Sequence, residues 1–164
     1  MTTVPFALFV SAAIAVWLAA LIHRRRSAPG AAPFVWLMAA VATWCLTSAL
    51  HGLTPSLTEK ILWAKVQYLA IATVPPLWFV FLAEYVGMRW ASDRLFRMLL
   101  AAIAIATIAL AFTNEWHGWI WSSVRLTPGG VAVYTHGPWF WLAATYQYAL
   151  VLGGTLVLIR AMRR

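Results

Sequence analysis

Charged residues are scarce in this sequence. It contains 12 Lys and Arg and 4 Asp and Glu among 164 residues, so 10% of the chain is charged, whereas a soluble domain carries about 25%. Hydrophobic residues make up 63% of the chain and the mean hydropathy is +0.80. This composition excludes an ordinary soluble domain and predicts an integral membrane protein.

Cysteine and catalytic motifs are also lacking. The single cysteine, Cys45, excludes an internal disulfide framework and leaves no cysteine pair for a metal site. There is no GxGxxG, P-loop, HExxH or GxSxG pattern, and only Glu84 among the four carboxylates lies within an apolar run. We therefore expect no catalytic site, no cofactor and no metal site, and we do not predict an enzyme.

The net charge of +8 does not indicate a nucleic-acid partner. The basic residues form short clusters at the ends of apolar runs instead of one continuous stripe. Such clusters are typical of membrane topology signals and of contacts with anionic lipid headgroups.

Five apolar runs are long enough to cross the bilayer, which needs roughly 20 helical residues. The predicted fold is an all-α bundle of five transmembrane helices in one domain, residues 1–164. The expected helices cover residues 4–22, 34–53, 61–86, 95–112 and 139–159. The first run is followed, not preceded, by its basic cluster, which argues against a cleaved signal peptide.

The basic residues alternate between the two sides of this bundle. Nine of the twelve lie in the three segments on one side, namely Arg24, Arg25 and Arg26; Arg89, Arg94 and Arg97; and Arg160, Arg163 and Arg164. The other side has Lys60, Lys65 and Arg125. The positive-inside rule then predicts that the N-terminus is outside and the C-terminus in the cytoplasm, as an odd number of spans requires.

The longest outer segment, residues 113–138, begins with TNEWHGWIW. Pro128-Gly129-Gly130 and the alternating residues 131–134 make a small hairpin plausible. The shorter outer loop contains Thr58, whose hydroxyl is expected to cap the third helix.

Polar residues interleave with tryptophan in the outer segment. One interpretation is an aromatic belt at the headgroup level. The other is an outward-facing cup that binds a small extracellular ligand, with Asn114, His117, Trp121 and Trp139 in its wall and Lys65 and Tyr68 beneath. Glu115, His117 and His136 would be the candidates for a metal, but their spacing matches no strong signature.

The third run contains polar residues at membrane depth and two consecutive prolines. Lys65 is expected either to snorkel outward or to face the bundle interior, and Glu84 to reach Arg89 or Arg94. Pro75 and Pro76 remove two backbone donors, so we expect a kink at this point. The kink is either a static bend or a hinge between the two halves of the bundle.

Three segments, in this order and spacing, carry a resemblance to a known family: LWAKVQYLAIATVPPLWFVFLAEYVG, TNEWHGWIW and GPWFWLAATYQYALVLGGTLVLIR. They resemble the seven-transmembrane N-terminal sensor region of bacterial histidine kinases over about residues 34–160. That family has seven helices, whereas five are counted here, and its output modules are not in this sequence. The chain is therefore expected to be a fragment, a truncated product or a stand-alone membrane subunit.

The resemblance implies a sensory input domain in the bacterial inner membrane. Its expected partners are the lipid bilayer, a cytoplasmic kinase or cyclase output module, an unidentified small extracellular ligand and, as a homodimer, a second copy of the chain. The alternatives are a small transporter or channel subunit and an assembly subunit without a ligand.

Overall fold

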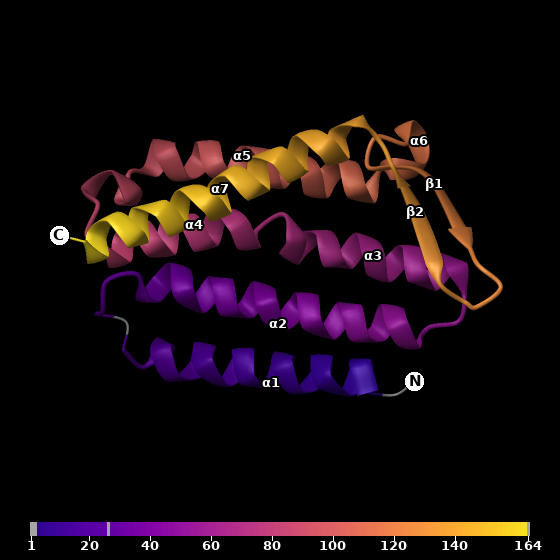
Figure 1. Ribbon diagram of the computed structural model, residues 1–164, viewed down its shortest axis with the longest axis horizontal. Helices are drawn as coiled ribbons and strands as arrows, with labels where there is room; N and C mark the ends of the chain where they lie inside the picture. Colours follow the sequence, from indigo (N-terminus) through magenta and orange to yellow (C-terminus); the bar gives the residue numbers. More distant parts are fainter. Residues whose placement is uncertain (1–2, 26, 164) are drawn as a thin grey trace.

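The computed structural model describes residues 3–25 and 27–163, and over these residues the chain is a bundle of long helices with a small hairpin at one end (Figure 1). Arg26 and Arg164, two members of the predicted basic clusters, lie outside the described residues. The long helices are α1 (Thr3–His23), α2 (Ala31–Leu53), α3 (Leu57–Ile71), α4 (Val74–Tyr85), α5 (Arg94–Phe112) and α7 (Pro138–Met162). The short elements are the 3-10 helix η1 (Arg89–Ser92), α6 (Asn114–His117) and the strands β1 (Trp121–Leu126) and β2 (Ala132–His136).

The prediction of five long apolar helices is confirmed. Five stretches of the described chain have the length and composition to cross a membrane, with α3 and α4 together forming the third, Leu57–Tyr85. The second and third begin three or four residues earlier than expected, at Ala31 and Leu57.

The α3–α4 span lies at the centre of the bundle (Figure 1). α2 packs along both α3 and α4, while α7 packs mainly on α4 and α5 mainly on α3. α1 packs against α2 at the edge of the bundle. The central span therefore connects one end of the bundle to the other and contacts three neighbouring spans on the way.

The central span is broken, and the break lies before the two prolines instead of at them. α3 ends at Ile71 and α4 begins at Val74, so Pro75 and Pro76 lie in the first turn of α4. A proline ring clashes with the carbonyl four residues earlier, but a first helical turn needs no N–H donor there. The helix therefore ends before the prolines and restarts with them.

The hydroxyl of Thr73 takes over a carbonyl that the break leaves free. The Thr73 amide donates to Ala70 O at 3.0 Å, three residues back, instead of to Leu69 O. The Thr73 Oγ1 hydroxyl donates to Leu69 O at 2.6 Å. The hydroxyl thus satisfies the Leu69 carbonyl within a span apolar enough to cross a membrane, where no water would be available as a donor.

Two predicted side-chain interactions are wrong. α3 begins at Leu57 with Ser56 at the cap position, so Thr58 is already inside the first turn and does not cap the helix. Glu84 forms its ion pair with Arg97, not with Arg89 or Arg94. Arg97 lies one turn into α5, which brings its guanidinium back to α4, and its Nε also donates to Ala91 O at 2.9 Å.

We call the two ends of the bundle the hairpin end and the arginine end. The hairpin end holds α6, β1 and β2 (Figure 1). The arginine end holds the α1–α2 turn, residues 86–93 and the end of α7.

Candidate functional site

Residues 114–136 form a compact structure that we call the hairpin cap. β1 and β2 pair antiparallel from Trp121 opposite His136 to Leu126 opposite Ala132, with a bulge between Trp121 and Ser123. Gly130, with φ of 75°, allows the turn between the strands. The predicted hairpin is confirmed, and it lies across the ends of the helices (Figure 1).

Asn114 organises the turn that leads into β1. Its Oδ1 accepts hydrogen bonds from the amides of Ile120 at 2.9 Å and Trp121 at 3.0 Å. Its Nδ2 donates to Trp121 O at 2.9 Å. All three bonds serve the backbone, so the side chain holds α6 and the start of β1 together.

His117 is also used within the hairpin cap. Its Nδ1 accepts from the Trp119 amide at 3.0 Å, and its Nε2 lies 3.1 Å from Thr113 Oγ1. Gly118 follows with φ of 65°, a left-handed conformation that ends α6 and reverses the chain. Within the described residues no three His, Cys, Asp or Glu side chains gather as a metal site would require.

Trp121 fills the centre of the cap. Its indole is 6% exposed and packs edge-on to Tyr68 of α3, with ring centroids 5.3 Å apart, and against Tyr134 of β2 at 5.1 Å. The buried cluster also contains Ala64, Ala111 and Ile120. The hairpin cap is therefore joined to α3 and α5 by a small apolar core of its own.

The start of α7 is tied to the same cap. Trp139 packs against the cluster, and its Nε1 donates to Thr107 Oγ1 of α5 at 3.0 Å. The backbone of Gly137 is so close to the carbonyls of Gly118 and Trp119 that a Cβ there would clash. Hydrogen bonds from Gly137 N to Ile120 O and from Trp139 N to Trp119 O complete this contact.

Lys65 reaches the hairpin cap by an ion pair. Its Nζ lies 2.6 Å from Glu115 Oε1 and also donates to Phe112 O at 3.1 Å. The hydrogen bond from Lys65 is the main cause that lowers the pKa of Glu115 below its ordinary value. Glu115 is therefore ionised at neutral pH, and the pair joins α3 to α6.

The predicted ligand residues are thus brought to one end of the bundle, but they face one another. Tyr68, Trp121 and Trp139 pack together, while Asn114, His117 and Lys65 bond to other groups of the cap and of α5. Trp116 and Trp119 are the exposed tryptophans of residues 114–121, at 86% and 48%.

Sequence reasoning missed a second polar contact at this end. Lys60 is 4% exposed and donates from Nζ to His51 O at 2.9 Å, and His51 Nε2 lies 3.0 Å from the Tyr134 hydroxyl. Burial raises the pKa of Tyr134, so this hydroxyl keeps its proton. In the sequence, His51 and Lys60 are the two ends of one short stretch, HGLTPSLTEK, and this spacing could have predicted their contact.

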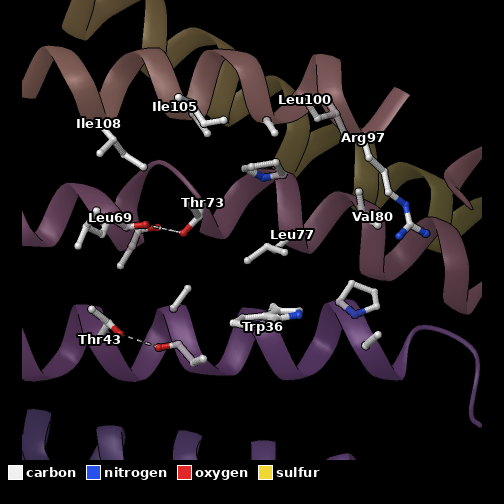
Figure 2. Close-up of a pocket in the computed structure, with 18 residues that line it drawn as sticks. Trp36, Thr43, Leu69, Thr73, Leu77, Val80, Arg97, Leu100, Ile105 and Ile108 are labelled. Atoms are coloured by element: carbon white, nitrogen blue, oxygen red, sulfur yellow. Dashed lines mark hydrogen bonds between the residues drawn. The ribbon is translucent and has the colours of Figure 1, made fainter. Parts of the chain in front are cut away.

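The largest difference from expectation is a cavity of about 590 Å³ in the middle of the bundle. We call it the lateral groove. It lies between α2 and α5, with α3, the break and α4 as its floor, and α7 lies behind that floor (Figure 2). Trp36 and Ile105, on opposite walls, are 68% and 64% exposed, so the groove opens to the surroundings of the bundle.

Small residues make room for the lateral groove. The alanines at positions 32, 39, 40, 70, 101 and 104 line it, and their recurrence on three neighbouring spans was the signal in the sequence. Its two threonines turn their hydroxyls to their own helices, Thr43 to Ala39 O at 2.9 Å and Thr73 to Leu69 O. At the arginine end, Arg97 is the one charged side chain among the lining residues (Figure 2).

Comparison with known proteins identifies the family. No match was found among curated proteins or among solved structures. The family model described as the N-terminal 7TM region of histidine kinase matches residues 7–164, nearly the whole chain and including both the hairpin cap and the lateral groove. The chain belongs to the family of N-terminal seven-transmembrane regions of histidine kinases.

Proposed function

We propose that this chain is the membrane-embedded sensory input region of a bacterial signalling protein and that it passes a signal from the hairpin cap to a kinase module. The family is by description the N-terminal region of a kinase, which implies such an output module. The chain would lie in the bacterial inner membrane. A small extracellular ligand, or a change in the bilayer, would be the signal.

The observation that carries the proposal is that one span, α3 followed by α4, joins the two ends of the bundle. Its hairpin end is bound to the cap by the Tyr68–Trp121 contact and the Lys65–Glu115 pair. Its arginine end is bound to α5 by the Glu84–Arg97 pair. The 29 residues between Leu57 and Tyr85 cover about 43 Å at 1.5 Å per residue, enough to cross the bilayer.

The break at Ala72–Thr73 divides this span into two rigid halves. A change in cap packing would move α3, and the break would let α4 respond as a separate rigid body. Pro75 and Pro76, in the first turn of α4, would form the α4 side of the hinge. Such a shift between two packed arrangements is a general route for signals through a bundle. The site residues are those of the cap contact: Asn114, His117, Trp121, Trp139, Lys65 and Tyr68.

The proposal places the hairpin cap outside the cell and the arginine end in the cytoplasm, as the positive-inside rule requires. Gly129→Cys in a Cys45→Ala background is expected to react with a membrane-impermeant maleimide in whole cells, because Gly129 lies in the exposed turn of the hairpin. Ser27→Cys, in the turn at the arginine end, is expected to react only after permeabilisation. The reverse pattern would contradict the orientation and with it the sensory role of the cap.

The functional test joins the chain to a histidine kinase module and measures autophosphorylation in membrane vesicles. Trp121→Ala and Tyr68→Leu, on the two sides of the cap contact, are expected to shift kinase output in the same direction, by about fivefold or more, the usual lower range of coupling between sites. Trp116→Ala, which removes the exposed indole, is the matched control and is expected to leave output unchanged. Unchanged output in both contact variants, with normal membrane insertion, would refute the proposal.

A further inference from the structure

We propose that the lateral groove is a binding site for one acyl chain of an anionic membrane phospholipid whose headgroup lies at Arg97. This inference concerns occupancy of the groove. Any effect of lipid binding on signalling rests on the proposed function, whereas the binding itself does not.

The position of the groove among membrane-spanning helices excludes a polar occupant. All of its walls belong to spans that are long and apolar enough to cross the membrane. Its threonine hydroxyls donate to carbonyls of their own helices, so they offer little to a polar ligand. Apart from Trp36 and Arg97, the surface that remains is alanine, leucine, isoleucine, valine and proline side chains, which favours a hydrocarbon chain over any group with unsatisfied donors.

The length of the groove fits a single acyl chain. Along α2 it runs from Ala32 to Thr43, about 17 Å at 1.5 Å per residue. This is close to the depth of one leaflet, roughly half of the 30 Å hydrocarbon core.

The charge at the arginine end fits an anionic headgroup. Residues 84–97 hold Arg89, Arg94 and Arg97 against Glu84 and Asp93, a net charge of +1 from three minus two. Arg97 donates to Glu84 from Nη2 and to Ala91 O from Nε. A guanidinium has five N–H donors in all, so others remain for phosphate oxygens. Trp36 lies on the opposite wall, and its amphipathic ring suits the headgroup boundary.

The position of the groove connects it to the break in the central span. Thr73 and Pro76 both line the groove, one from the break and one from the first turn of α4 (Figure 2). A chain in the groove would therefore contact α3 and α4 on either side of the hinge. Lipid occupancy would favour one angle between the two halves over others.

The test uses the 164-residue chain in phosphatidylcholine vesicles that contain a trace of phosphatidylglycerol with a diazirine in the middle of one acyl chain. After irradiation, adducts are located by peptide mass spectrometry. Adducts on the groove residues Leu69 and Ile105 are expected to exceed those on the exposed α1 residues Val10 and Val16 by about tenfold, which corresponds to 1.4 kcal/mol of preference. Added unlabelled phosphatidylglycerol should suppress the groove adducts more strongly than the same amount of added phosphatidylcholine does.

Two adjacent alanines provide matched variants. Ala101→Leu places a larger side chain in the groove, whereas Ala102 is exposed and is not among its lining residues. Groove adducts should be lost in Ala101→Leu and kept in Ala102→Leu, while both chains retain the thermal unfolding of the parent. Because the labelling needs no kinase module, it can fail while the cap variants still change kinase output, and the reverse also holds.

Three results would overturn the inference. Equal labelling of α1 and the groove, or groove labelling that persists in Ala101→Leu, would show ordinary boundary lipid. Equal competition by phosphatidylcholine would remove the role of Arg97 in headgroup choice. Cross-links from the groove to a second copy of the chain, in place of lipid adducts, would show a self-association surface.

Discussion

Trp121→Ala is expected to release the hairpin cap from the bundle, with the largest loss of local stability among the changes considered. The indole is almost fully buried between Tyr68 and Tyr134 and is the largest member of the apolar cluster. Replacing a buried Trp by Ala removes about 3–5 kcal/mol. Amide hydrogen exchange of β1 and β2 in lipid nanodiscs should therefore quicken by two orders of magnitude or more, since each 1.4 kcal/mol is about tenfold.

The change should remain local. The amides of α1 and of the middle of α2 should exchange as in the parent, because these helices have no part in the cluster. Trp116→Ala serves as the control, because Trp116 is also a tryptophan of the cap but is 86% exposed. Its replacement should change the exchange rates by less than about threefold, the range of surface substitutions. Similar effects of the two replacements would show that the cap has no core of its own.

Asn114→Ala is expected to open the turn between α6 and β1. The change leaves the amides of Ile120 and Trp121 and the carbonyl of Trp121 without their side-chain partner. Ile120 is fully buried, so water cannot replace the lost acceptor without opening the structure. A buried donor left unsatisfied costs about 1–3 kcal/mol, so we expect a loss of about 3 kcal/mol for the set. Exchange of the Ile120 and Trp121 amides should report it directly.

The matched variants for this position are graded. Asn114→Asp keeps an oxygen acceptor for the two amides but loses the donor to Trp121 O, so its exchange rates should lie between those of the parent and of the alanine variant. Ser123→Ala removes one exposed hydrogen bond to Thr135 Oγ1 and should have little effect. An alanine variant that exchanges as slowly as Ser123→Ala would refute the role given to Asn114.

The two predictions bear on how the proposed extracellular signal would be received. If Trp121 and Asn114 hold the cap closed, an outer ligand has no open cup to enter and must displace part of the cap to bind. Part of the binding free energy of such a ligand would then drive a discrete change in the cap. Such coupling suits a two-state switch better than a preformed pocket does. The Lys65–Glu115 pair at the rim is a weak cap contact, since Glu115 is largely exposed and exposed pairs contribute about 0–1 kcal/mol.

The long apolar runs illustrate what can be predicted from such a sequence. A helix in lipid must satisfy its own backbone, so span length and hydropathy predict spanning helices with little help from their neighbours. The hairpin was predictable for a similar local reason, since Pro128-Gly129-Gly130 is a turn sequence and a short alternating run, residues 131–134, follows it. A kink in the third span was predicted, but its position was not. Pro75 and Pro76 lie in the first turn of α4, where proline is tolerated, so the break falls before them at Ala72–Thr73.

The sequence by itself determined that this chain has five long apolar helices, a broken third span and a hairpin at one end, because each follows from local periodicity, proline chemistry or turn residues. Only the tertiary structure decided that Trp121 packs inward while Trp116 faces out, that Glu84 pairs with Arg97, and that six alanines on three helices leave a lateral groove. These depend on the rotation and spacing of one helix against another. Such quantities arise from side-chain packing between segments far apart in the chain, and no local pattern encodes them.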